Sequence, residues 1–196
     1  MKRFFDLLLA LILSFFLIWL IVLVAIVVRL SSKGPVLYWS SRIGVDNQLF
    51  KMPKFRTMRA QTPVLATHLM TNPNTFLSPV GAFLRRFSLD ELPQLFSILK
   101  GEMSFVGPRP ESPDYTKLYT EKQLAILELR PGITDFASIE FSDLGSILTG
   151  DDPDKIYFEK VWDRKMKLRL KYVNERSFWI DIKLIFQTLS AIFVRK

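Results

Sequence analysis

The most pronounced hydrophobic pattern in the chain is an apolar run over residues 7 to 28. The run carries no charge, and Ser14 is its one polar break. As an α-helix it would be about 33 Å long, enough to cross a hydrocarbon core of roughly 30 Å. It is too long for the core of a signal peptide and lacks a small-residue cleavage site. A buried helix of a soluble protein rarely holds so long an apolar stretch, so the pattern predicts a retained membrane helix.

The pattern changes to one typical of β-structure beyond this segment. Two apolar stretches, residues 36–39 and 49–52, flank the turn residues 44–47, which predicts a β-hairpin. Residues 54–58 continue in an extended pattern. Because side chains alternate along a strand, Lys54 and Arg56 are expected on one face, for which a solvent-exposed edge strand is the simplest explanation.

Helical patterns dominate the remainder of the chain. Helices are expected over residues 79–87, 121–129, 152–173 and 178–193, and a short strand over residues 103–106. Pro153 suits the first position of its helix. The last helix combines Trp, Phe and Lys side chains, as helices lying in a membrane headgroup layer do, and a helix of the protein core is the alternative.

Composition narrows the chemistry available to the chain. It has 196 residues, no cysteine and one histidine, His68, which lies in a polar stretch expected to be an exposed loop. Disulfides, thiolate metal sites and multi-histidine metal sites are therefore excluded. Catalysis would depend on carboxylates, Arg, Lys and hydroxyl groups, a set that suits magnesium and phosphate.

The charge balance indicates polyanionic partners. The formal net charge is +8 and the pI is about 9.8. Such a balance suits nucleic acid, anionic lipid headgroups or phosphorylated substrates. The membrane segment favours the last two, and no nucleic-acid partner is expected.

The segment from Ser88 to Leu95 is the strongest candidate for chemistry. Ser88 followed by Glu91, ahead of an apolar run, predicts a capping box and a helix start at this point. Asp90 and Glu91 would then lie in the first turn, where the helix dipole favours negative charge and an anion site is possible. Pro93 removes a backbone donor, which predicts a distorted turn. Taken alone, the two acids could simply complement the dipole.

A second candidate lies a short way downstream. The residues Gly107-Pro108-Arg109-Pro110 predict a rigid turn, because the two prolines fix the backbone on either side of Arg109. The planar guanidinium of arginine suits bidentate binding of a phosphate. The turn therefore strengthens the case for a phosphate site.

Together these motifs resemble the bacterial sugar transferase family, the small monotopic phosphoglycosyl transferases. The resemblance rests on the Ser88 to Leu95 and Gly107 to Pro110 motifs and covers nearly the whole chain. It extends through these shorter motifs: Lys2-Arg3-Phe4-Phe5-Asp6, Lys33-Gly34-Pro35-Val36, Lys54-Phe55-Arg56-Thr57-Met58 and Arg130-Pro131-Gly132-Ile133-Thr134. It implies an α+β fold with a membrane-embedded helix, residues 1–30, and a mostly helical cytoplasmic catalytic domain, residues 31–196, which carries membrane-surface helices.

The resemblance also implies an activity. The chain would move a sugar phosphate from a nucleotide diphosphate sugar, expected to be a UDP-sugar, to polyprenyl (undecaprenyl) phosphate, and so begin glycoconjugate synthesis. Asp90 would form a covalent phosphosugar intermediate. Glu91, with Asp90 and the diphosphate, would hold Mg²⁺. Lys54 and Arg109 would stabilise the phosphoryl charge.

Three further cations are candidate substrate ligands. Arg56 accompanies Lys54 in its motif. Arg86 follows Arg85 at the end of the expected helix at residues 79–87. This basic pair suits either lipid headgroups or the phosphate site, and a solvated basic patch is an equal alternative. Arg130 is placed to reach a nucleotide or phosphate, and a salt bridge to a nearby carboxylate explains it equally well.

Two alternative functions use the same features. A membrane-anchored, Mg²⁺-dependent phosphatase or nucleotide-sugar hydrolase would need the same carboxylates and cations, with water as acceptor. A non-enzymatic basic membrane-binding protein would explain the charge and the apolar helix, but not the adjacent carboxylates with an arginine fixed close behind them. The sequence leaves the oligomeric state open.

The path of the membrane helix is a separate question. The resemblance implies a re-entrant helix bent at a Ser-Pro pair, but Ile18 and Trp19 occupy the equivalent positions here. Cations nevertheless flank both ends of the segment, with Lys2 before it and Arg29 after it. A spanning helix would place Lys2 outside, against the positive-inside tendency. We therefore expect a re-entrant helix, which enters the bacterial inner membrane and returns so that both its ends lie on the cytoplasmic face, with a spanning helix as the alternative.

Overall fold

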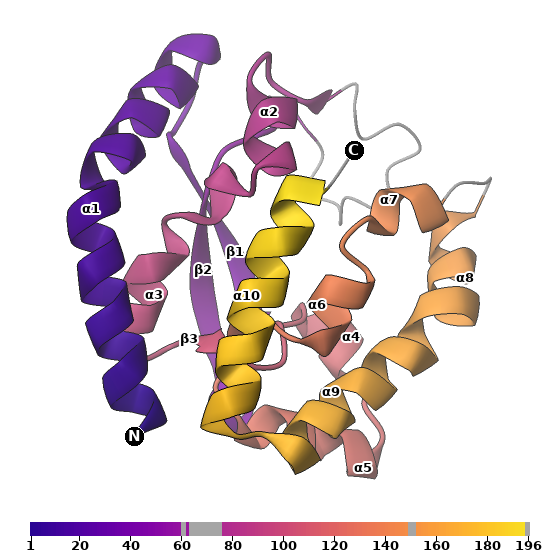
Figure 1. Ribbon diagram of the computed structural model, residues 1–196. Helices are drawn as coiled ribbons and strands as arrows, with labels where there is room; N and C mark the ends of the chain where they lie inside the picture. The colour runs from indigo at the N-terminus through magenta and orange to yellow at the C-terminus, as the bar shows by residue number, and fades with distance from the viewer. Residues whose placement is uncertain (60–61, 63–75, 149–151, 195–196) are drawn as a thin grey trace.

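The computed structural model describes residues 1–59, 62, 76–148 and 152–194 (Figure 1). His68 lies outside these residues. The longer elements are α1 (Lys2–Ser31), β1 (Leu37–Ile43), β2 (Leu49–Phe55), α9 (Asp163–Glu175) and α10 (Phe178–Val194). The shorter elements are η1 (Val45–Asn47), α2 (Gly81–Arg86), η4 (Leu89–Glu91), α3 (Gln94–Lys100), β3 (Ser104–Val106), α4 (Pro113–Thr116), α5 (Glu121–Leu124), η5 (Ala125–Glu128), β4 (Gly132–Thr134), α6 (Phe136–Glu140), α7 (Leu144–Ile147), α8 (Pro153–Tyr157) and η6 (Phe158–Trp162). The predicted α+β class is confirmed.

The apolar run forms α1, a continuous helix that lies along one side of the molecule (Figure 1). One stripe, which includes Ala10, Val24 and Val28, is buried against the rest of the protein. The remaining faces expose large apolar side chains, among them Phe15, Phe16, Trp19 and Leu30. By length and composition, α1 is the one helix within the described ranges that could cross a membrane.

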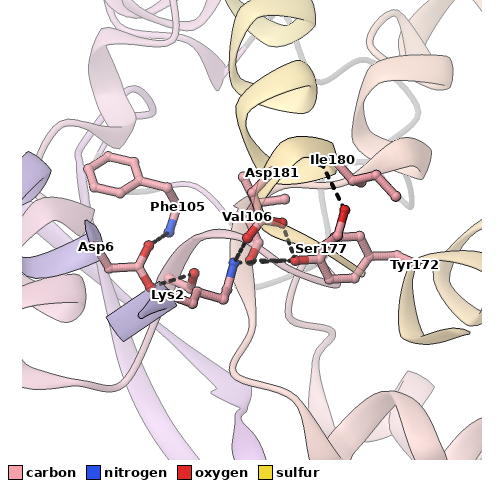
Figure 2. Close-up of polar contacts among 9 residues, drawn as sticks. Lys2, Asp6, Phe105, Val106, Tyr172, Ser177, Ile180 and Asp181 are labelled. Carbon is pink, nitrogen blue, oxygen red and sulfur yellow. Dashed lines mark hydrogen bonds and ion pairs between the residues drawn. The ribbon is translucent and has the colours of Figure 1, made fainter. Parts of the chain in front are cut away.

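The N-terminal end of α1 is fixed to the domain by buried polar contacts (Figure 2). Lys2 Nζ lies 2.5 Å from Asp181 Oδ2 on α10, and the Tyr172 hydroxyl donates to Asp181 Oδ1 at 2.6 Å. The Asp6 carboxylate accepts hydrogen bonds from the Ser104 hydroxyl at 2.9 Å and the Phe105 backbone N–H at 3.2 Å. These contacts tie the start of α1 to β3 and α10.

The C-terminal end of α1 meets the β-hairpin and α2. Val24 and Val28 pack in one buried cluster with Phe55 of β2 and Leu84 of α2. Arg56 donates to the Ser32 carbonyl at 2.7 Å, just past the helix end. Both ends of α1 therefore contact the same domain.

Two small sheets carry the backbone toward the candidate site. The predicted hairpin is confirmed as the antiparallel pair β1 and β2, in which Tyr38 pairs with Lys54. The predicted strand at residues 103–106 is confirmed as β3, which pairs in parallel with β4. Strand β4 was not predicted, because its three residues are too few to show a period.

The main core lies between α1, the hairpin and the C-terminal helices. It includes Met52, Ile98, Met103, Tyr172 and Leu184, each 0 to 2% exposed. A second buried cluster, which includes the aromatic residues Tyr157 and Trp162, joins α8, η6 and α9. The four expected helices are confirmed, with two changes: the helix expected over residues 121–129 changes to a 3₁₀ turn at η5, and the one over residues 152–173 passes through a π-helical turn at η6.

Helix α10 combines both roles that its sequence allowed. Asp181 and Leu184 are buried in the protein. Trp179, Phe186 and Leu189 are exposed on the outside of the same helix. One face thus belongs to the core and the other presents apolar side chains outward.

Candidate active site

The acidic pair lies in the 3₁₀ turn η4, before α3 begins. The expected capping box at Ser88 is wrong: Ser88 has a left-handed backbone, with φ of 54°, and makes no capping hydrogen bond. Helix α3 begins only at Gln94, after Pro93. Proline lacks an N–H and clashes with the preceding turn of a helix, so the helix cannot extend back to Ser88. The distortion expected from Pro93 is confirmed.

Glu91 binds two cations through one oxygen. Lys54 Nζ, from the end of β2, donates to Glu91 Oε1 at 2.8 Å. Arg109 Nη2 forms an ion pair with the same oxygen. Three residues far apart in the sequence, all predicted site residues, thus meet in one partly buried cluster.

Arg109 is held from three directions. Its Nη1 donates to the Ile133 carbonyl at 2.6 Å, and its backbone N–H donates to Asp135 Oδ2 at 3.0 Å. Just before it, Gly107 crosses Gly132 so closely that a Cβ on Gly132 would lie 2.1 Å from the Gly107 nitrogen. The rigid turn predicted around Arg109 is therefore fixed by its neighbours as well as by its prolines.

Asp90 is 8% exposed, and its carboxyl group has no hydrogen bond or ion pair to another described residue. Burial, followed by the negative charge of Glu91, raises the pKa of Asp90 to about 6, and the nearby cations Lys54, Arg85 and Arg109 limit the increase. The group is therefore ionised at neutral pH but poorly solvated. A carboxylate in that state is a candidate nucleophile.

The pKa of Glu91 moves in the opposite direction. Burial alone would raise it, but the charges and hydrogen bonds of Arg109 and Lys54 hold it well below its usual range. Glu91 is thus a permanent anion.

The other predicted site residues lie apart from this cluster. Arg56 is 6% exposed and bonds to Ser32 at the end of α1. Arg86 is exposed and lies over the ring of Phe87. Arg130 is exposed and donates to the Gly101 carbonyl at 2.9 Å. The structure does not bring these three arginines to Asp90 or Glu91.

Arg85 was considered only together with Arg86, as one basic pair, and its particular interaction with the acidic site was not predicted. Its Nε donates to the Thr57 hydroxyl at 2.8 Å, and its charge interacts with that of Asp90. Successive residues of a helix point about 100° apart, so Arg85 and Arg86 had to face different sides of α2. Considering this rotation in the sequence would have distinguished the two arginines.

A second charged network behind Arg109 was also missed. Arg169, 1% exposed, lies 2.9 Å from Glu111 Oε1 and 3.5 Å from Asp135 Oδ2. Lys165 forms an ion pair with the same Glu111 oxygen. Glu111 lies two residues after Arg109, and Asp135 accepts a hydrogen bond from the Arg109 backbone N–H. Because Arg169 contacts both of these carboxylates, it holds the Arg109 loop at two points. The one available signal was the mixture of basic and apolar residues along α9.

The donors present fit a magnesium ion only in part. Both cations contact Glu91 Oε1, which leaves its Oε2 and the Asp90 carboxylate as oxygen ligands. No cluster of three or more acidic or histidine side chains occurs within the described ranges. Mg²⁺ is commonly held by one or two carboxylates together with substrate phosphates, and the pair satisfies that requirement.

Taken together, the cluster combines a buried carboxylate, Asp90, with two fixed cations, Lys54 and Arg109. Such an arrangement suits transfer of a phosphoryl group, in which negative charge on the phosphate oxygens must be stabilised.

Comparison with known proteins agrees with this chemistry. The family model described as bacterial sugar transferase matches residues 1–195. The chain is 38% identical to undecaprenyl-phosphate glucose phosphotransferase of Komagataeibacter xylinus, over 96% of this chain and 35% of that protein. It is 36% identical to the uncharacterized sugar transferase EpsL of Bacillus subtilis, over 99% of this chain and 88% of that protein. It is 34% identical to UDP-glucose:undecaprenyl-phosphate glucose-1-phosphate transferase of Escherichia coli, over 100% of this chain and 41% of that protein. The chain thus spans well under half the length of two of these three relatives.

Proposed function

Because the chain belongs to the bacterial sugar transferase family, we propose that it is a phosphoglycosyl transferase that moves a sugar phosphate from a nucleotide diphosphate sugar to polyprenyl phosphate. The observation that carries the proposal is the cluster of Asp90 and Glu91 with Lys54 and Arg109. The names of two relatives specify glucose and undecaprenyl phosphate, which supports undecaprenyl phosphate as acceptor. One of these names also specifies UDP-glucose, which supports a UDP-sugar as donor.

In the proposed reaction, Asp90 attacks the phosphorus atom attached to the sugar. An acyl-phosphate bond forms, and the bond to the bridging oxygen breaks as the nucleoside monophosphate leaves. The phosphate of the lipid then attacks the same phosphorus and releases Asp90. Two steps through a covalent intermediate replace one direct displacement between two anions.

The neighbouring residues stabilise charge in both steps. Lys54 and Arg109 are held in place by Glu91, so their N–H groups are already oriented when a diphosphate enters. Glu91 and Asp90 would hold Mg²⁺ together with the diphosphate. When bound, the ion would neutralise phosphate charge that otherwise repels the Asp90 carboxylate.

We also propose that both ends of α1 lie on the cytoplasmic side of the inner membrane. The polar anchor of Lys2 and Asp6 at one end and the Arg56–Ser32 contact at the other support this orientation. Both ends of α1 contact the same domain, so a helix that spanned the bilayer would pull part of that domain into the lipid. Unpaired polar groups are costly there. The structure does not show the interruption expected of a re-entrant helix at Ile18 and Trp19, because α1 is continuous from Lys2 to Ser31. The helix would instead lie along the membrane, with its exposed apolar side chains in lipid.

The activity is tested by incubating the purified protein with nucleotide sugars and undecaprenyl phosphate in the presence of Mg²⁺. The proposal requires nucleoside monophosphate release that depends on the lipid for turnover, and a phosphosugar-linked lipid product. With nucleotide sugar alone, intact mass should show one phosphosugar on Asp90. Continuous release of sugar or phosphate into water without lipid would instead identify a hydrolase.

A further inference from the structure

A third cation, Arg42, lies on the same face of the hairpin as Lys54. Tyr38 pairs with Lys54 across the two strands, and Arg42 follows Tyr38 by four residues on β1. Since side chains alternate, Arg42 and Lys54 point to the same side of the sheet. The Ile43 N–H donates to the Glu111 carbonyl at 3.0 Å, which fixes the end of β1 beside the loop that carries Arg109.

The charge of Arg42 is not matched by an anion of its own. The guanidinium interacts electrostatically with Glu111, Arg109 and Glu91. Glu111 already pairs with Lys165 and Arg169, and Glu91 with Lys54 and Arg109. Arg42 makes no side-chain hydrogen bond or ion pair to another described residue, and its Nε is buried without a partner.

A buried guanidinium with unused donors is unfavourable unless an anion binds it. Burial lowers the pKa of Arg42 from its ordinary value, as expected for a cation removed from water. The side chain is half-buried, so an anion can still reach it. The position therefore has the properties of an anion-binding group.

The place of Arg42 relative to Asp90 indicates which anion it binds. Asp90 interacts with Glu91, Lys54, Arg85 and Arg109, and two of these, Glu91 and Arg109, also interact with Arg42. Arg42 thus shares two electrostatic neighbours with Asp90. A diphosphate attacked by Asp90 at one phosphorus would bring its second phosphate among the cations of this cluster, where Arg42 has no anion of its own within the described residues.

We propose that Arg42 binds the phosphate of the leaving nucleoside monophosphate, an inference that rests on the proposed function. As the Asp90 oxygen bonds to the sugar-bearing phosphorus, the bond to the bridging oxygen breaks. The electron pair stays on that oxygen, which becomes a terminal oxygen of the monophosphate and adds one negative charge to it. The free N–H donors of Arg42 stabilise this charge without any proton transfer.

The test measures binding of a nucleoside monophosphate directly. Isothermal titration with uridine monophosphate compares the wild type with Arg42→Gln, Arg42→Lys and the control Lys51→Gln. Lys51 is a cation of the same hairpin that is exposed and bonds only to the Ser41 hydroxyl at 2.7 Å among the described contacts. Arg42→Gln should weaken binding about tenfold, the effect of losing a charge-assisted hydrogen bond. Arg42→Lys should be intermediate, and Lys51→Gln unchanged.

A kinetic measurement separates this role from a structural one. Arg42→Gln should slow formation of the phosphosugar on Asp90, but not its transfer from the preloaded enzyme to undecaprenyl phosphate. Equal monophosphate affinity in Arg42→Gln and wild type would overturn this inference and leave the proposed function intact. If Arg42→Gln fails to fold, unchanged binding in Arg42→Lys together with an unchanged first step would overturn the inference in the same way. A wild type that neither binds nor releases any nucleoside monophosphate would overturn the proposed function as well.

Discussion

Asp90 and Glu91 are adjacent in the chain, yet the structure moves the pKa values of their carboxyl groups in opposite directions. Glu91 meets two cations, which stabilise its charge. Asp90 is buried beside that charge and forms no ion pair to a described residue, so its pKa rises to about 6. The same 3₁₀ turn therefore presents one carboxylate whose charge is stabilised by cations and one whose charge is disfavoured by burial. This difference suits the separate roles of anchor and nucleophile.

Asp90→Asn should abolish turnover and raise the stability of the protein. The folded state holds a proton on Asp90 more tightly than the unfolded chain does, so the contribution of this group to stability falls as pH rises from about 4 to about 6. Removing the charge should recover about 1 to 3 kcal/mol at pH 7.5. Thermal unfolding measures this gain, which should vanish near pH 4. The exposed control Asp114→Asn should change nothing, and a destabilised or active Asp90→Asn protein would contradict the assignment.

Glu91→Gln should lower the stability of the protein, in contrast to Asp90→Asn. The amide leaves Lys54 and Arg109 without their shared anion, at an expected cost of about 1 to 3 kcal/mol. Turnover should fall strongly, and the Mg²⁺ concentration needed for half-maximal rate should rise, because the ion loses a charged ligand. Exposed Glu128→Gln is the matched control. If Glu91→Gln keeps both its Mg²⁺ dependence and its stability, Glu91 holds neither the cations nor the ion.

Arg109→Lys should be nearly as inactive as Arg109→Ala. The guanidinium bonds the Ile133 carbonyl through one nitrogen and Glu91 through another, a bridge that a single ammonium group cannot reproduce. Steady-state rates of the two variants against wild type provide the measurement. Near-normal turnover in Arg109→Lys would show that a point charge suffices.

Gly132→Ala should prevent correct folding of the Arg109 loop. The new Cβ would lie 2.1 Å from the Gly107 nitrogen and 2.5 Å from its carbonyl oxygen, so the two backbones must separate. We expect a loss of several kcal/mol, beyond the usual range for one substitution. Gly145→Ala is the control, because the nearest atom to its new Cβ is 4.0 Å away. Similar thermal stability of the two variants would refute the close approach of Gly107 and Gly132.

The proposed membrane orientation is tested by cysteine labelling, since the chain has no cysteine of its own. One variant carries a cysteine appended before Met1, which spares the Lys2–Asp181 pair, and the other carries Lys51→Cys. In intact cells an impermeant thiol reagent should label neither, and in opened vesicles it should label both. Labelling of the N-terminal cysteine alone in intact cells would establish a spanning helix.

Local patterns predicted much of the fold, whereas Lys54 was expected at the candidate site only from the family resemblance. The apolar run, the hairpin and the Arg109 turn each depend on neighbouring residues, so each could be recognised in the sequence. The start of α3 was misplaced because Pro93 outweighed a capping pattern that looked complete. Lys54 and Arg56 were expected on one face of a strand, but only Lys54 contacts the acidic pair. Strand β2 ends at Phe55, so the alternation of side chains does not extend to Arg56.

The residues that were missed act through contacts distant in sequence. Arg169 reaches Glu111 and Asp135 only because α9 packs behind the Arg109 loop. Arg42 is indistinguishable from any strand cation until β1 is fixed beside Glu111. The hydrophobic periodicity of a helix or strand predicts neither the contacts of Arg169 nor the position of Arg42.

The Lys2–Asp181 pair also constrains the order in which the protein can assemble. Its partners are 179 residues apart, at nearly opposite ends of the chain. A ribosome makes Lys2 179 residues before Asp181, so the apolar helix must remain without this anchor while the intervening chain is made. Contacts of such long range form late in folding. The final docking of α1 must therefore wait until α10 has been made, and a chain that stops before α10 would keep its apolar helix but leave Lys2 without its partner.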